Sequence, residues 1–157
     1  MNKQITLTIN GEARAVEVGP TDILLDVLRE KLGIKSPKIG CERGDCGACT
    51  VLLDGKSVRS CLILAIEADG HKITTLEGLS RNGLTPLQES LLKHGAFQCG
   101  FCAPGIVLSA TELLAKHPHP SEEEIKESIS GNLCRCTGYK PIIEAIAAVS
   151  KARRKSV

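Results

Sequence analysis

The residues of this 157-residue chain best suited to chemistry are its eight cysteines. Three of them share one glycine-rich loop with the spacing C-x4-C-x2-C, and a fourth follows after eleven residues: Cys41, Cys46, Cys49 and Cys61. This spacing is typical of the thiolates that hold a plant-type [2Fe–2S] cluster. The glycines of the loop let the backbone pass close to an anionic cluster and adopt positive φ cheaply. We therefore predict a first [2Fe–2S] site here, with buried free thiols or disulfides as the alternative.

The remaining four cysteines form two close pairs, Cys99 and Cys102 as C-x2-C and Cys134 and Cys136 as C-x-C. Pairs of the C-x2-C type are common in structural zinc sites. The C-x-C pair would crowd two ligands of one tetrahedral ion, whereas a binuclear cluster places two thiolates on each iron and relieves the crowding. A second [2Fe–2S] cluster is predicted, with structural zinc as the alternative. All eight cysteines are then used, four for each cluster.

The overall composition excludes several classes of function. Hydrophobic residues make up 42 % of the chain, which is enough for a globular core, but aromatic residues make up only 2 %. Stacking platforms for nucleic acid are therefore absent, and a net charge of +2 indicates no polyanionic partner. No secretory signal and no apolar run of the roughly 18 residues that a membrane helix requires is found. We expect a cytoplasmic metal protein without membrane insertion.

The first half of the chain reads as strands around one helix. Apolar residues alternate before the Asn10-Gly11 hairpin turn, and a second strand is expected at Arg14–Val18. A helix is expected over Asp22–Leu32, capped by Thr21. Further strands follow the cysteine loop, at residues 50–53, 56–60 and 72–76. This order predicts a β-grasp arrangement in which one helix lies on a mixed sheet.

The second half has helical periodicity. Residues 77–84 carry two glycines and are read as a linker. Four short helices are expected after it, and two of them begin with capping boxes, at Thr85 and Ser121. So small a group of helices buries little surface, and a metal cluster would tie them together. The expected fold class is α+β: a plant-type ferredoxin-like domain at residues 1–78 and a four-helix bundle that binds the second cluster at residues 79–157.

Three stretches that contain the cysteines resemble the signatures of a known family. They are Gly40–Thr50 (GCERGDCGACT), Gln98–Gly105 (QCGFCAPG) and Gly131–Tyr139 (GNLCRCTGY). Together they look like the small iron–sulfur subunit of the molybdenum hydroxylases, the family of xanthine dehydrogenase, aldehyde oxidoreductase and carbon monoxide dehydrogenase. The similarity covers essentially the whole chain, and every cysteine position is matched.

The resemblance implies the cofactors and partners of an electron-transfer subunit. In that family a molybdopterin-type molybdenum cofactor sits in a large subunit and FAD usually sits in a medium one. Electrons pass from molybdenum to the cluster of the helical half, then to the ferredoxin-like cluster, then to FAD. The implied complex is a heterotrimer or a dimer of heterotrimers. By position, the cluster nearest molybdenum would be held by Cys99, Cys102, Cys134 and Cys136, and the cluster nearest FAD by Cys41, Cys46, Cys49 and Cys61.

Two residues match family positions that approach the pterin, Gln98 and Cys136. The Gln98 amide could hydrogen-bond a pterin edge because it both donates and accepts; alternatively, it only tethers the backbone. No catalytic residue is predicted in this chain, because no Ser/His/Asp set, carboxylate pair or phosphate loop stands out. The expected function is an electron relay within a molybdenum-containing oxidoreductase, and a free-standing two-cluster ferredoxin is the alternative.

Overall fold

The first half of the chain forms one mixed sheet in the computed structural model, which describes residues 1–155. The strand order is β2-β1-β5-β3-β4, and the strands are β1 (Lys3–Ile9), β2 (Glu12–Val18), β3 (Thr50–Leu53), β4 (Lys56–Arg59) and β5 (Lys72–Thr74). The β1–β5 pair is parallel and the other neighbouring pairs are antiparallel. The predicted hairpin is confirmed: Asn10 and Gly11 both have positive φ, and Ile9 pairs with Glu12.

The helix of the sheet half is shorter and wider than predicted. It comprises α1 (Leu24–Asp26) and a π-helical turn, η1 (Val27–Lys31). The predicted cap at Thr21 is wrong, because Ile23 is extended at the helix start and the Leu24 N–H bonds to the Ile63 carbonyl. Four closely spaced side chains of this segment are buried: Leu24, Leu25, Val27 and Leu28. Burial of their apolar surface stabilises the segment in its place.

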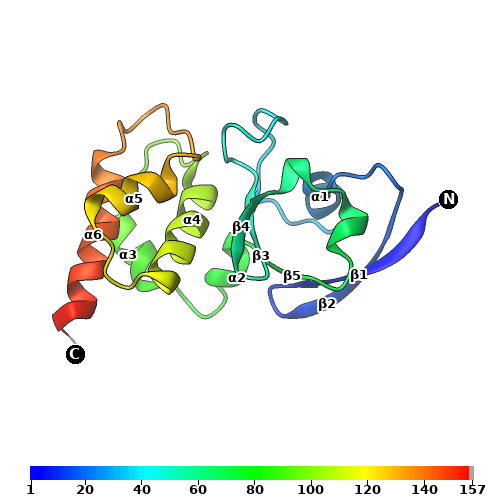
Figure 1. Cartoon of the computed structure of the whole chain (residues 1–157), viewed down its shortest axis with the longest axis horizontal. Helices are drawn as coiled ribbons and strands as arrows, with labels where there is room; N and C mark the ends of the chain where they lie inside the picture. The colour runs from blue at the N-terminus through cyan, green and yellow to red at the C-terminus, as the bar shows by residue number, and fades with distance from the viewer. Residues whose placement is uncertain (156–157) are drawn as a thin grey trace.

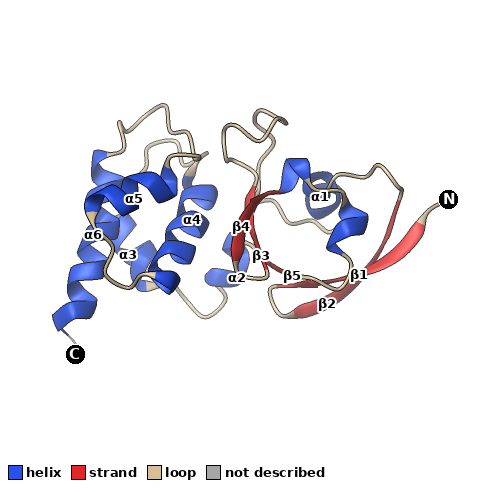
Figure 2. Cartoon of the chain, viewed as in Figure 1, coloured by secondary structure: helices blue, strands red, loops and turns tan. Residues whose placement is uncertain are grey.

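Two short 3-10 segments complete the sheet half. They are η2 (Ser60–Leu62), which carries Cys61 back towards the cysteine loop, and η3 (Ala65–Ala68). The core under the sheet is aliphatic and is formed mainly by alternate residues of β1 and by the helix. The sheet and helix together thus form a rigid base from which the loop at residues 40–49 projects (Figures 1 and 2).

The second half of the chain is helical. Its elements are α2 (Leu76–Leu79), α3 (Pro86–Lys93), α4 (Ala103–Lys116), α5 (Glu122–Ile129) and α6 (Lys140–Lys155). Both capping boxes are confirmed by reciprocal hydrogen bonds, at Thr85 with Gln88 and at Ser121 with Glu124. The predicted linker at residues 77–84 is wrong in part, because it begins inside α2. Glu77 accepts hydrogen bonds there from Ser36 and from Thr75, which orders this segment against the sheet half.

Helix α4 makes a large part of the contact between the two halves. It packs against β3 and β4, and its other side contacts α5 and α3 (Figure 1). The contact is close because glycines meet across it: a Cβ on Gly105 of α4 would lie 2.4 Å from the Gly47 carbonyl oxygen. The backbones of the two halves therefore approach each other more closely than any side chain at these positions would allow.

No helix in the described part of the chain has both the length and the apolar character needed to cross a bilayer.

Substitution of Gly105 tests this close approach. Alanine improves helix propensity by about 1 kcal/mol, but the overlap with Gly47 costs about 1–3 kcal/mol. We expect Gly105→Ala to lower the free energy of unfolding, measured by urea denaturation. Ala115→Gly, at an exposed position of the same helix, calibrates the propensity effect alone. A Gly105→Ala protein more stable than the parent would show that the contact can accommodate a methyl group at this position.

Candidate metal centres

The first cysteine loop is organised by backbone amides. The Cys41 sulfur accepts hydrogen bonds from the N–H groups of Cys46, at 3.3 Å, and Arg43, at 3.4 Å. The Cys46 amide, followed by the Arg43 amide, lowers the pKa of Cys41 to about 6. Gly44 and Gly47 have positive φ in this loop, as the interleaved glycines predict. The loop is therefore prepared to hold a thiolate at Cys41.

The other two cysteines of this set are buried against the helix of the sheet half. Cys49 and Cys61 pack with Leu25. The Ser60 hydroxyl donates to the Cys49 carbonyl at 2.7 Å, which ties the segment carrying Cys61 to the loop. Burial raises the pKa of Cys61 to about 11, because little water remains to solvate its thiolate. A bound cation would supply the missing compensation.

The second set of cysteines comes from two loops of the helical half. The sulfurs of Cys99 and Cys136 lie 3.7 Å apart, and both residues are exposed. Cys102 is buried, and burial together with the neighbouring Cys134 thiol raises the pKa of Cys102 to about 12. The Gln98 side-chain amide donates to the Cys136 carbonyl at 3.1 Å. Gln98 thus links the two loops through a backbone carbonyl. This is the alternative role given for Gln98 in the sequence analysis, in which its amide only tethers the backbone.

The eight thiols are arranged in four pairs. Within each pair the side chains are close enough to interact: Cys41 with Cys46, Cys49 with Cys61, Cys99 with Cys136, and Cys102 with Cys134. Residues 1–155 contain no group of three Cys, His, Asp or Glu side chains that would hold one ion. Two pairs for each site match a binuclear cluster, in which each iron takes two thiolates. The donor set therefore fits [2Fe–2S] clusters.

The two sites are joined by the side chain of Asn132. Its amide nitrogen donates to the Gly47 carbonyl and to the Thr50 hydroxyl, both at 3.1 Å. Its amide oxygen accepts from the Ser109 hydroxyl at 2.8 Å. The side chains of Asn132, Thr50 and Ser109 belong to residues that are at most 4 % exposed. Every polar atom of the buried amide is thus paired, as burial requires.

Further hydrogen bonds extend this link on both sides. Arg59 of β4 donates to the Thr50 hydroxyl at 2.9 Å and to the Gly131 carbonyl at 2.7 Å. The Leu133 N–H donates to the Cys46 carbonyl at 2.9 Å. Leu133 directly precedes Cys134. A single hydrogen bond therefore links Cys46, of the first cysteine set, to the residue beside Cys134, of the second set.

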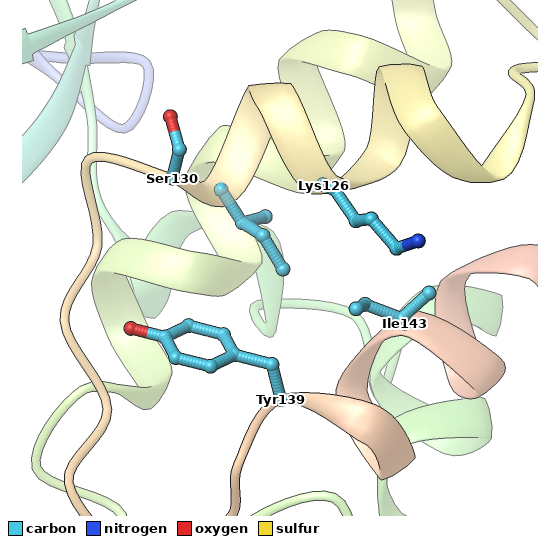
Figure 3. A pocket seen from close by; sticks show the side chains of 5 residues that line it. Lys126, Ser130, Tyr139 and Ile143 are labelled. Atoms are coloured by element: carbon cyan, nitrogen blue, oxygen red, sulfur yellow. The ribbon is translucent and has the colours of Figure 1, made fainter.

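A pocket of about 340 Å³ lies between α5 and α6 (Figure 3). It adjoins the loop at residues 130–139, which carries Cys134 and Cys136 and is called the second cysteine loop below. Its walls include the Tyr139 ring, Ile143 and the stem of Lys126. The Tyr139 hydroxyl accepts from the Cys134 N–H at 2.8 Å and donates to the Asn132 carbonyl at 3.1 Å. Tyr139 therefore supports this loop through its hydroxyl, and its ring lines the pocket.

The cysteines stand out in the sequence, but the residues that hold the two loops together do not. Asn132, Thr50 and Tyr139 lie inside or at the ends of the quoted signature stretches, yet their partners are up to 85 residues away. For Asn132 the sequence offers one signal of this role, which is a polar residue next to a glycine, Gly131. Nothing in its spacing indicated which distant group it would bind.

Comparison with known proteins gives consistent matches along the chain. Residues 7–85 match the family model "2Fe-2S iron-sulfur cluster binding domain", and residues 75–147 match "[2Fe-2S] binding domain". The chain is 52 % identical to the nicotine 6-hydroxylase small subunit of Paenarthrobacter nicotinovorans, over 91 % of this chain and 87 % of that protein. It is 44 % identical to the xanthine dehydrogenase iron-sulfur-binding subunit of Escherichia coli O157:H7, over 95 % of each chain.

A solved structure confirms the fold. The chain matches a chain of quinoline 2-oxidoreductase from Pseudomonas putida 86 with a TM-score of 0.92 and 50 % sequence identity, covering 98 % of this chain and 97 % of that one. The five-stranded sheet with its helix thus has the [2Fe–2S] ferredoxin-like fold.

Substitution of Asn132 tests the link between the two sites. Asn132→Leu keeps the branching at Cγ but removes three hydrogen bonds, so we expect a loss of about 2–4 kcal/mol in the free energy of unfolding. Ser109→Ala removes one partner and should cost about 1 kcal/mol. Because both changes affect one shared hydrogen bond, the double variant should cost less than the sum. Strict additivity in urea denaturation would contradict the network.

Proposed function

This chain belongs to the family of small iron–sulfur subunits of the molybdenum hydroxylases, and we propose that it conducts electrons from a molybdenum centre to FAD through two [2Fe–2S] clusters. Its relatives are subunits of dehydrogenases and oxidoreductases, and the chain is accordingly an oxidoreductase subunit with two [2Fe–2S]-binding domains. The molybdenum cofactor and FAD would be held by partner subunits. This chain would transfer the electrons, and the partner subunits would provide the substrate site.

The observation that carries the proposal is the pairing of the eight thiols. The first cluster would be held by Cys41 and Cys46 on one iron and by Cys49 and Cys61 on the other. The second would be held by Cys99 and Cys136 on its outer iron and by the remaining pair, Cys102 and Cys134, on its inner iron. In the second set the outer pair is exposed and Cys102 is buried. The second cluster would thus have one iron facing the surface of this chain.

The exposed pair marks where electrons would enter. Gln98 stands beside Cys136 and uses one amide hydrogen on the Cys136 carbonyl. A glutamine amide has a second hydrogen and an oxygen acceptor, which we assign to the pterin edge. Electrons would then leave the second cluster on the side of Cys134 and reach the first through the segment where Leu133 donates to Cys46. FAD would take them from the first cluster.

The proposed domain division assigns one cluster to each half of the chain. We propose that residues 1–78 form the plant-type ferredoxin-like domain and residues 79–157 the second domain, in which α3, α4, α5 and α6 make a four-helix bundle. Contacts of α3 with α6, α4 with α5 and α5 with α6 favour this arrangement. The second cluster would lie at the end of the bundle, where its two cysteine loops meet.

Exposed apolar side chains around the cysteine loops favour a docked partner. They include Ile39 at 43 %, Phe101 at 47 % and Leu133 at 58 % exposure. Each lies within two residues of a proposed cluster ligand, so a large subunit that covers this surface would bring its cofactor close to a cluster. We propose a large molybdopterin-binding subunit here, a medium FAD subunit near the first loop, and a cytoplasmic heterotrimer or dimer of heterotrimers.

Elemental analysis across a gel-filtration run of the natively purified protein tests this function. We expect about four irons per chain, from two binuclear clusters, in a peak that also contains molybdenum and is much heavier than 16.7 kDa. Four irons in a small peak without molybdenum would instead favour a free two-cluster carrier. Two irons with one zinc would refute the second cluster.

Two serine substitutions test the order of the relay. Cys136→Ser should damage the second cluster and block the flow of electrons from molybdenum, while the electron paramagnetic resonance (EPR) signal of the first cluster persists. Cys46→Ser should remove the first cluster and slow flavin reduction in stopped-flow measurements. Normal flavin reduction in the Cys46→Ser complex would place that cluster off the path. The Ser80→Ala complex, altered midway in sequence between Cys61 and Cys99, serves as the matched control.

A further inference from the structure

One side chain in the second cysteine loop contacts a sulfur directly. The Thr137 hydroxyl oxygen lies 3.1 Å from the Cys134 sulfur. The same oxygen is 3.2 Å from the backbone nitrogen of Tyr139, which donates to it. Thr137 and Cys134 are both partly buried, so bulk water competes only partly for this contact.

The direction of the contact follows from the hydrogens available. A threonine hydroxyl carries one hydrogen and two acceptor positions. The Tyr139 N–H can only donate, so it occupies an acceptor position of the hydroxyl. A cysteine that ligates iron is a thiolate and has no hydrogen to give. The hydroxyl hydrogen of Thr137 must therefore point at the Cys134 sulfur.

The surrounding loop holds Thr137 in this orientation. Tyr139 has a φ of 68°, an uncommon value for a residue other than glycine. This conformation directs its N–H to Thr137, and its own hydroxyl is fixed between the Cys134 N–H and the Asn132 carbonyl. The hydroxyl of Thr137 thus has a defined orientation before any electron arrives, because its neighbours already determine where it can donate.

We propose that Thr137 is a positioning residue that raises the reduction potential of the second cluster by donating a hydrogen bond to Cys134. The proposal rests on the proposed function, in which Cys134 is a ligand of that cluster. Reduction adds one negative charge, part of which resides on the sulfurs, and a donated hydrogen bond stabilises that charge. The Thr137 hydroxyl contacts Cys134, a residue of the second cysteine set, so we expect its effect on the potential of the second cluster.

Redox titration of the purified complex, followed by the EPR signals of the two clusters, tests the proposal. Thr137→Val keeps the side-chain shape and removes the hydroxyl. At a given potential we expect the ratio of reduced to oxidised second cluster to fall about tenfold, a shift of about 59 mV to more negative potential for a one-electron couple. The first cluster should keep its potential. Thr137→Ser retains the donor and should titrate like the parent.

Each outcome decides the matter. An unchanged potential in Thr137→Val, an equal shift in Thr137→Ser, or an equal shift of both clusters would overturn the role of the hydroxyl. If the valine variant fails to assemble, Thr137→Ala, which cannot overfill the site, should show the same shift in potential. If the alanine variant also loses the cluster while the serine variant keeps it, the hydroxyl serves cluster assembly. That result would overturn the proposal. A parent complex with a single iron–sulfur signal would refute the proposed function itself, whereas two signals with unmoved potentials refute only this inference.

Discussion

The arrangement of this chain depends on one buried amide. Asn132 pairs both polar atoms of its side chain in the contact between the halves: the nitrogen donates to Gly47 and Thr50, and the oxygen accepts from Ser109. A buried amide left unpaired is costly, whereas a fully paired one adds stability and fixes geometry. The contact can therefore form well in only one relative placement of the halves. Because both cysteine loops are anchored to this contact, their separation is set by hydrogen bonds and not by loop flexibility.

The same contact explains why the glycines occur where they do. A Cβ on Gly47 would lie 2.3 Å from the Gly131 carbonyl oxygen, and one on Gly131 would lie 2.3 Å from the Arg59 guanidinium. The neighbour of Gly47 is backbone, so this position is glycine for reasons of space between segments, whereas the neighbour of Gly131 is the end of a flexible side chain. In Gly47 the requirement is double, since its φ is also positive. Glycines that suggest a cluster-wrapping loop in the sequence thus also serve the approach of two backbones.

The sequence allowed prediction of the features that local patterns encode. Cysteine spacing indicated both cysteine sets, alternation indicated β1, and the capping boxes at Thr85 and Ser121 marked the starts of α3 and α5. The start of the helix at Leu24 was missed because a long-range bridge between Ile23 and Leu64 competes with local capping. The Asn132 network was missed for a related reason: periodicity records which faces are apolar, but not which buried polar atoms pair across the chain.

The link through Asn132 also has an evolutionary consequence. The acceptors for Asn132 lie on the first cysteine loop and on β3, whereas the amide itself belongs to the helical half. A ferredoxin-like domain exchanged by recombination would keep this contact only if it carried glycine at 47 and a hydroxyl at 50. The two halves can be told apart in the fold, but the exchange of either one alone would have to preserve the shape of this single hydrogen-bonded contact.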